Sequence, residues 1–183
     1  MAYRIATLVG SLRRESFNRQ FAEALVKLAP GDFNFDFLEI GDLPLYNQDD
    51  DANQAPQVKR LKQQVRDAQG VLFVTAEYNR SLPGVLKNAI DNASRPYGDS
   101  AWAGKPAGIV GVSDGAIGTA CAQQALRDVL AYLDMPTLGQ PEAFIQQKDD
   151  LYDGAGNIGD ASREFLQGWM DRYVAWVKRH ASQ

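Results

Sequence analysis

Three segments of the sequence carry hydroxyl, amide or charged side chains directly after an apolar run, and the first and third of them also contain glycine. They are Gly10–Asn18, Ala76–Ser81 and Ser113–Gly118. Glycine lets a ligand approach the backbone closely, and short polar side chains beside it can donate or accept hydrogen bonds. These residue types therefore indicate the binding of a small polar ligand.

The first segment lies between a predicted strand and a predicted helix, where free backbone N–H groups and the helix dipole favour an anion. Ser11, Ser16 and Asn18 supply short donors, and Arg13 can add a charged, bidentate contact. Together they suit a terminal phosphate, although the pattern is neither Gly-x-Gly-x-x-Gly nor a Walker loop. The alternative is that Ser16 only caps the helix.

The second segment follows the clearest interior strand of the sequence, Val71–Thr75. It places Glu77, Tyr78 and Asn79 at the carboxyl end of that strand, and an aromatic ring beside acidic and amide groups suggests a planar polar ligand. Backbone N–H groups there could meet the edge of a heterocycle. The alternative is ordinary turn chemistry, in which Asn79 adopts a left-handed backbone.

The third segment suggests a rival hypothesis, because Gly111-x-Ser113-x-Gly115 matches the nucleophile-elbow pattern of serine hydrolases. An acid and His180 lie downstream, in the order that the hydrolase fold requires. However, His180 lies close to the end of the sequence, where chains are usually mobile, and a catalytic base must reach its serine. A glycine-rich turn that admits a ligand to the backbone is the alternative.

Short apolar runs alternate with longer helical periodicities along the chain. Strands are expected at residues 3–9, 33–38, 71–75, 106–112 and between 137 and 145. Helical patterns span residues 17–28, 58–68, 84–93, 117–133 and 165–176. This alternation predicts parallel strands joined by right-handed crossovers, with helices on both faces.

We therefore expect one domain over residues 1–183, an α/β fold with a flavodoxin-like, doubly wound, five-stranded parallel sheet. Ligands of such sheets bind beyond the carboxyl ends of the strands, at the point where the strand order reverses. All three polar segments follow predicted strands. The fold would therefore bring them together at one site.

Composition limits the function classes. Of the 183 residues, 45% are hydrophobic and 23% are charged, as in ordinary globular proteins. One cysteine, Cys121, and one histidine, His180, cannot form the usual zinc sites, and the cysteine count fits a reducing, cytoplasmic location. The net charge of −4 disfavours nucleic acid as a partner. No apolar run is long enough to span a membrane.

Two longer motifs resemble those of the NAD(P)H-dependent FMN reductase family, in its quinone and chromate reductase branch. They are Gly10-Ser11-Leu12-Arg13-x-x-Ser16-Phe17-Asn18 and Glu77-Tyr78-Asn79-x-Ser81-x-Pro83-Gly84-x-Leu86-Lys87-Asn88-Ala89-Ile90-Asp91. Gly104-Lys105-Pro106 and Gly115-x-Ile117-Gly118 also fit. Any one motif is weak, but all of them in this order are specific, and the resemblance covers nearly the whole chain.

The resemblance implies a flavodoxin-like fold that binds FMN noncovalently. The first segment would hold the FMN phosphate, the second would line the isoalloxazine ring, and the third would approach the flavin. The candidate cofactor-binding residues are Ser11, Arg13, Ser16, Phe17, Asn18, Ala76, Glu77, Tyr78, Asn79 and Ser113. The family commonly has proline where this chain has Ala76, a difference that frees φ and restores an N–H group.

By the same resemblance, the chain is expected to take hydride from NADH or NADPH and to reduce quinones, with chromate, azo compounds or free flavins as other acceptors. Because a flavin accepts hydride itself, no catalytic side chain or metal is expected, and Glu77 is assigned a binding role only. Use of one open flavin face by both substrates in turn predicts ping-pong kinetics. The alternatives are a flavodoxin-like electron carrier, which Arg13, Arg14 and the modest net charge argue against, and a serine hydrolase using Ser113.

Members of this branch are typically dimers or tetramers with the flavin near a subunit boundary. The wide apolar stripe of the helix over residues 117–133 fits a homodimer or homotetramer. Trp169 and Trp176 are expected in the core. Trp102 and Tyr97 lie in a predicted loop, where exposed aromatic side chains could contact a partner subunit or border the substrate opening.

Overall fold

The computed structural model describes residues 2–181 of the chain. Its strands are β1 (Tyr3–Val9), β2 (Phe33–Phe37), β3 (Gly70–Val74), β4 (Ala107–Ser113) and β5 (Phe144–Gln146). Its α-helices are α1 (Phe17–Leu25), α2 (Pro56–Asp67), α3 (Gly84–Ala93), α4 (Ala120–Tyr132) and α5 (Asp160–His180). Short 3₁₀ helices follow α1 at Val26–Leu28 and precede α2 at Gln48–Asn53.

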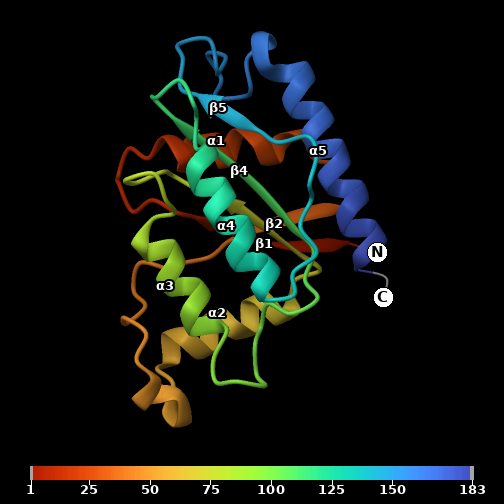
Figure 1. Cartoon of the computed structure of the whole chain (residues 1–183). Coiled ribbons are helices and arrows are strands. Elements are labelled where there is room, and N and C mark those ends of the chain that lie inside the picture. The colour runs from red at the N-terminus through yellow and green to blue at the C-terminus, as the bar shows by residue number, and fades with distance from the viewer. Residues whose placement is uncertain (1, 182–183) are drawn as a thin grey trace.

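The five strands form one parallel sheet in the order β2-β1-β3-β4-β5, with helices on both faces (Figure 1). The chain moves outward from β1 to β2 and then returns past β1 to β3, so the strand order reverses between β1 and β3. This confirms the expected flavodoxin-like fold class. Val9, Val74 and Val110 are paired across β1, β3 and β4, so the loops that follow these strands begin at a common edge.

Alternate strand positions fill two separate hydrophobic cores. In β1, Ile5 and Val9 belong to the core covered by α1 and α5, whereas Ala6 and Leu8 belong to the core beneath α2, α3 and α4. Every residue of β3 is buried. This burial explains why β3 reads as a continuous apolar run, because helices cover both faces of a parallel sheet.

The start of α4 differs from the sequence prediction. The helix was expected from about residue 117, but residues 115–118 form a turn in which the Gly118 N–H donates to the Gly115 carbonyl at 3.0 Å. Gly118 has φ +60°, and a Cβ there would lie 2.7 Å from the backbone of Phe144 and Ile145. The close approach of β5 therefore ends the loop in a left-handed glycine, and α4 begins at Ala120.

Trp102 contradicts the hypothesis that it is an exposed aromatic residue. Its side chain is fully buried, its indole N–H donates to the Ile90 carbonyl at 2.9 Å, and its ring lies 5.9 Å from that of Phe73. The loop after α3 folds back over the sheet and places the tryptophan in the core, which satisfies its one polar group. Tyr97 in the same loop is exposed.

The aromatic stripe of α5 is only partly buried. Trp169 and Tyr173 are buried and stacked at 5.5 Å, as expected, and Trp176 is partly buried against the same core. Phe165, one turn earlier, is 47% exposed, so the prediction that the stripe begins there is wrong. No helix in residues 2–181 is long and apolar enough to cross a membrane.

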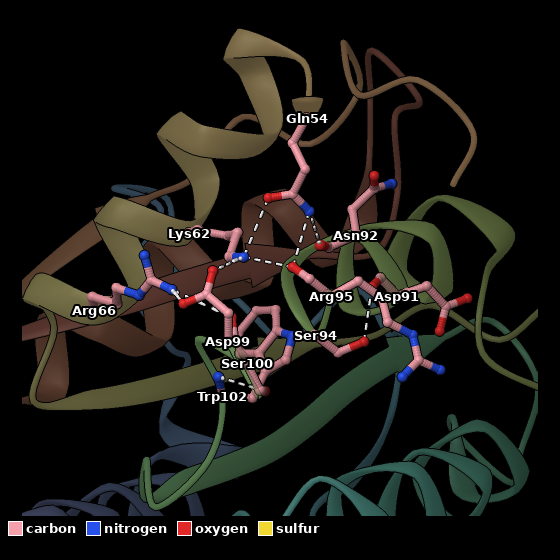
Figure 2. A network of polar contacts seen from close by, with 10 residues as sticks. All are labelled: Gln54, Lys62, Arg66, Asp91, Asn92, Ser94, Arg95, Asp99, Ser100 and Trp102. Atoms are coloured by element: carbon pink, nitrogen blue, oxygen red, sulfur yellow. Dashed lines mark hydrogen bonds and ion pairs between the residues drawn. The ribbon is translucent and has the colours of Figure 1, made fainter. Parts of the chain in front are cut away.

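A buried lysine fixes the loop between α3 and β4 (Figure 2). Lys62 of α2 is 2% exposed, and its ammonium group donates to the Gln54 amide oxygen, the Arg95 carbonyl and the Asp99 carboxylate at 3.2, 2.5 and 2.6 Å. Arg66 pairs with the same carboxylate at 2.5 Å. The hydrogen bond from Lys62 holds the pKa of Asp99 below its usual value, aided by the charge of Arg66. The network ties this loop to α2.

Candidate functional site

The three polar segments converge on one cavity at the carboxyl ends of β1, β3 and β4. Its lining includes every predicted cofactor-binding residue except Asn79. The lining residues are Ser11, Arg13, Ser16, Phe17, Asn18, Ala76, Glu77, Tyr78, Val112, Ser113 and Asp114. Val112 and Asp114 were not predicted, although both flank Ser113 at the end of β4, and their position beside it was the available signal.

Ser16 caps α1. Its Oγ accepts a hydrogen bond from the Arg19 N–H at 3.2 Å, with the extended backbone that an N-cap residue adopts. Ser16 therefore caps α1, and because a hydroxyl that accepts can still donate, this bond leaves the Ser16 hydroxyl able to bind a ligand as well. No acidic side chain lies in the first turn of α1, so no carboxylate within that turn offsets the positive end of the helix dipole.

Arg13 stands at the rim of the cavity. Its guanidinium lies over the Phe17 ring, 5.1 Å from the ring centre, and 4.0 Å from the Glu15 carboxylate. The Arg13 side chain is 59% exposed, so water weakens its contact with Glu15. Stacking on Phe17 orients the guanidinium while leaving its donors available to an anion.

Asn18 lines the cavity, and its side chain is also bonded to the end of β4. Its side-chain amide donates to the Val112 carbonyl and accepts from the Val112 N–H, both at 2.9 Å. Val112 lies beyond the last pairing of β4 with β3, at Val110, so its backbone groups have no strand neighbour on that side. Asn18 supplies the missing hydrogen bonds and thereby fixes the start of α1 to the end of β4.

The first two segments are pressed together at Gly10 and Ala76. The Gly10 N–H donates to the Val74 carbonyl at 2.9 Å, and a Cβ on Gly10 would lie 3.5 Å from the Ala76 nitrogen and 3.3 Å from the Leu86 side chain. Ala76 is 7% exposed, and its carbonyl accepts from the Thr75 hydroxyl at 2.6 Å. Burial and this hydrogen bond hold Ala76 in place, at the position where the resemblance implies proline.

Asn79 lies in a tight hairpin turn outside the cavity lining. Tyr78 and Ser81 exchange two backbone hydrogen bonds of 3.0 Å, and the intervening Asn79 and Arg80 have φ of 52° and 65°. Positive φ at both central residues is the type I′ hairpin, which asparagine accommodates well. The turn hypothesis for Asn79 is confirmed. The hairpin presents Tyr78, which is 52% exposed, at the edge of the cavity.

Glu77 is directed towards α4. Its carboxylate accepts a hydrogen bond from the Ala122 N–H at 3.0 Å, in the first turn of that helix. An anionic acceptor at a helix N-terminus is favoured by the free N–H groups and by the helix dipole. The side chain therefore connects the second segment to the element that follows the third.

The serine hydrolase hypothesis fails on geometry. The Ser113 hydroxyl donates to the Gly118 carbonyl at 2.5 Å, within its own loop. His180 lies at the other end of the sheet: its ring is 3.9 Å from Trp176, which donates to the Pro136 carbonyl beside Ala107, the first residue of β4. Ser113 is the last residue of β4, so the length of this strand separates the two side chains by roughly 20 Å. His180 cannot act as the base for Ser113.

Close packing explains why residue 111 is a glycine. A Cβ at this position would lie 2.2 Å from both the Thr75 carbonyl and the Thr119 hydroxyl oxygen. Only glycine allows β3, β4 and the start of α4 to approach this closely. The Gly-x-Ser-x-Gly pattern therefore reflects packing at the strand ends.

The donor set fits the FMN that the resemblance implies. Ser11, Arg13 and Ser16 gather at the start of α1, where a phosphate group would be stabilised. Ala76, Tyr78 and Ser113 line the other part of the cavity, with small and aromatic side chains suited to a flat ring. The cavity measures about 170 Å³, less than the roughly 300 Å³ at the lower end for ligand pockets. A bound flavin would therefore extend beyond it, past the exposed Tyr78.

Comparison with known proteins shows the family. The model of the NADPH-dependent FMN reductase family matches residues 3–150. A 2-hydroxy-1,4-benzoquinone reductase of a Burkholderia species is 56% identical over 97% of this chain and 98% of its own, and a quinone reductase of Pseudomonas putida is 51% identical over 96% and 95%. The structure of FerB, a flavoenzyme NAD(P)H:(acceptor) oxidoreductase from Paracoccus denitrificans, matches with TM-score 0.94 and 44% identity over 98% of this chain and 99% of FerB. The chain belongs to the NADPH-dependent FMN reductase family.

Proposed function

We propose that this protein is an FMN-dependent oxidoreductase that takes hydride from NADH or NADPH and reduces quinones. The observation that carries this proposal is the single cavity formed by all three polar segments at the point where the strand order reverses. Relatives that match nearly the whole chain carry the names 2-hydroxy-1,4-benzoquinone reductase and quinone reductase. Chromate, azo compounds and free flavins are further acceptors for assay.

The residues have separate tasks in this proposal. Ser11, Arg13 and Ser16 bind the FMN phosphate together with the N–H groups at the start of α1. The backbone of residues 76–78 and the loop at Ser113 hold the isoalloxazine ring. Asn18 fixes the start of α1 to the end of β4 through its two hydrogen bonds to Val112.

The side chains of the site bind and orient the reactants. Bound FMN supplies the chemistry, since it accepts hydride from the nicotinamide and passes electrons to the quinone. Glu77 is held by α4 and the Ser113 hydroxyl by the Gly118 carbonyl, so neither needs to transfer a proton in this scheme. Positioning the two substrates in turn against one flavin face is the task of the protein.

The open cavity favours a homodimer or homotetramer. A flavin that extends past the enclosed 170 Å³ would lie beside Tyr78, which lines the cavity and is 52% exposed. A second subunit over this edge would exclude water from the ring and cover the Tyr78 side chain.

We also place the enzyme in the cytoplasm, because a chain with one cysteine suits a reducing compartment.

Flavin binding tests the assignment. The purified protein should contain about one FMN per chain. The double variant Arg13→Ala with Ser16→Ala should lose most of it, because each charge-assisted contact is worth about 1.5–3 kcal/mol. Arg14→Ala is the matched control, since Arg14 lies on the same loop outside the cavity lining. Equal FMN affinity of the double variant and the wild type, measured by flavin fluorescence, would remove the phosphate-site assignment.

A further inference from the structure

The N-terminus of α4 takes its cap from another loop. Thr119, the N-cap residue, makes no side-chain capping bond, and no acidic residue lies in the first helical turn. The Thr119 hydroxyl oxygen instead accepts from the Gln123 amide at 3.0 Å. The capping acceptor for this turn is the Glu77 carboxylate, which receives the Ala122 N–H at 3.0 Å.

The start of α4 is a rigid anchor. Thr119 and Gln123 are fully buried, and the Gln123 amide donates to the Ala143 carbonyl at 2.8 Å. The Thr119 hydroxyl lies against Gly111 so closely that a Cβ there would collide with it. Burial and hydrogen bonds on both sides therefore hold this end of α4 on the sheet.

The segment over residues 76–81, which contains Glu77, is held by fewer contacts than the start of α4. On one side, Ala76 is buried against Gly10. On the other, the hairpin over residues 78–81 is closed by two backbone hydrogen bonds, and its central residues are exposed. The contact with Ala122 is the polar bond that ties the backbone between these supports to α4.

We propose that Glu77 is a positioning residue, which locks the ring-facing backbone of residues 76–78 onto α4. Through it, the loops that follow β3 and β4 form one wall of the cavity with a fixed spacing. The inference rests on the proposed function for the identity of the ligand, FMN. Glu77 then acts by geometry and by its charge at the helix end, and the reacting atoms do not touch its side chain.

Two substitutions at Glu77 separate the contribution of its hydrogen bond to Ala122 from that of its negative charge. Glu77→Ala removes the acceptor and should weaken FMN binding about tenfold to a hundredfold, the range expected for losing a hydrogen bond to a charged group. Glu77→Gln keeps an oxygen that can accept from Ala122 and should stay within about fivefold of the wild type. Wild-type FMN affinity in Glu77→Ala, measured by flavin fluorescence titration, would overturn the proposal.

A second variant distinguishes positioning from helix stability. Adding Ala120→Asp to Glu77→Ala places an acid at the first position of α4, which should restore thermal stability through the helix dipole. The proposal expects Tm to recover while FMN affinity stays low, because the new acid does not bind the second loop. Recovery of both together would show that Glu77 serves helix stability alone, and would overturn it.

Amide hydrogen exchange of flavin-free protein gives a readout that does not depend on the ligand. Glu77→Ala should raise the exchange rates of the Tyr78 and Ser81 amides, which close the hairpin, above those of the wild type. Unchanged rates would count against positioning by Glu77. Failure of the wild type itself to bind FMN would refute the proposed function. The exchange comparison would still test whether Glu77 ties its segment to α4.

Discussion

At the scale of single residues, polar side chains near the cavity divide into those free to meet a ligand and those that satisfy the backbone. The sequence predicts that Ser16, Asn18 and Asn79 lie at strand ends, because their types and spacing follow apolar runs. It does not distinguish their hydrogen-bond partners. Asn18 bonds to Val112, 94 positions away, and such a partner depends on how the strands end relative to one another.

Asn18→Ala should destabilise the protein by about 2–4 kcal/mol. The substitution leaves the buried N–H and carbonyl of Val112 without partners, and each unsatisfied group costs about 1–3 kcal/mol. Urea unfolding of flavin-free protein measures this directly. Asn79→Ala serves as a control of the same type on an exposed turn, where the cost of a left-handed alanine is about 1–2 kcal/mol. A smaller loss of unfolding free energy for Asn18→Ala than for Asn79→Ala would refute the stabilising role of the two Asn18–Val112 hydrogen bonds.

At the scale of elements, the local pattern predicts some boundaries well and others poorly. For β1 and α3 the expected and observed ranges agree, because an apolar run and a helical periodicity are local signals. The start of α4 could not be placed, since it depends on β5 approaching Gly118. Trp102 was misplaced because its loop is held down by a lysine from α2, a contact that no local pattern reveals.

The Lys62–Asp99 pair predicts a pH-dependent contribution to stability. Asp99→Asn leaves a buried ammonium without its counter-charge, and should cost about 1–3 kcal/mol at pH 7, reduced because Asp99 is half exposed. The pKa of Asp99 is lowered by Lys62. Its contribution is therefore complete above the unfolded value of about 4 and declines as the pH falls through the lower folded value.

Urea unfolding at pH 7 and at about pH 2–3 checks this sign. The stability difference between the wild type and Asp99→Asn should shrink at the acid pH, because the wild type then loses the same charge. Asp36→Asn breaks a half-exposed surface pair with Arg4 and should change stability by less than about 1 kcal/mol at pH 7. A difference for Asp99→Asn that grows on acidification would contradict the account.

At the scale of the whole molecule, the strand order places the ligand site, and its open side bears on assembly. Alternation of strands and helices was enough to predict the doubly wound sheet and the meeting of three loops. The prediction that Trp102 helps to join subunits does not survive, since it is fully buried. The part-exposed face of α4 and the exposed Tyr78 remain as the proposed contact surface.

Light scattering should show a dimer or tetramer at micromolar concentration. Ala125→Arg, on the part-exposed face of α4, should shift the protein towards monomers, because a buried unpaired charge opposes association. Ala175→Arg adds the same charge on the exposed face of α5 and should leave the assembly intact. A monomeric wild type would refute the proposed assembly.

The central claim is that one bound flavin at the strand ends receives electrons from NAD(P)H and gives them to quinones in turn. The most direct test follows the visible flavin absorbance of the purified protein without oxygen, first with NADPH or NADH alone and then after adding menadione. The account predicts that the nicotinamide alone bleaches the flavin and that the quinone restores it. Absence of flavin absorbance, or bleaching that requires the quinone to be present, would contradict it.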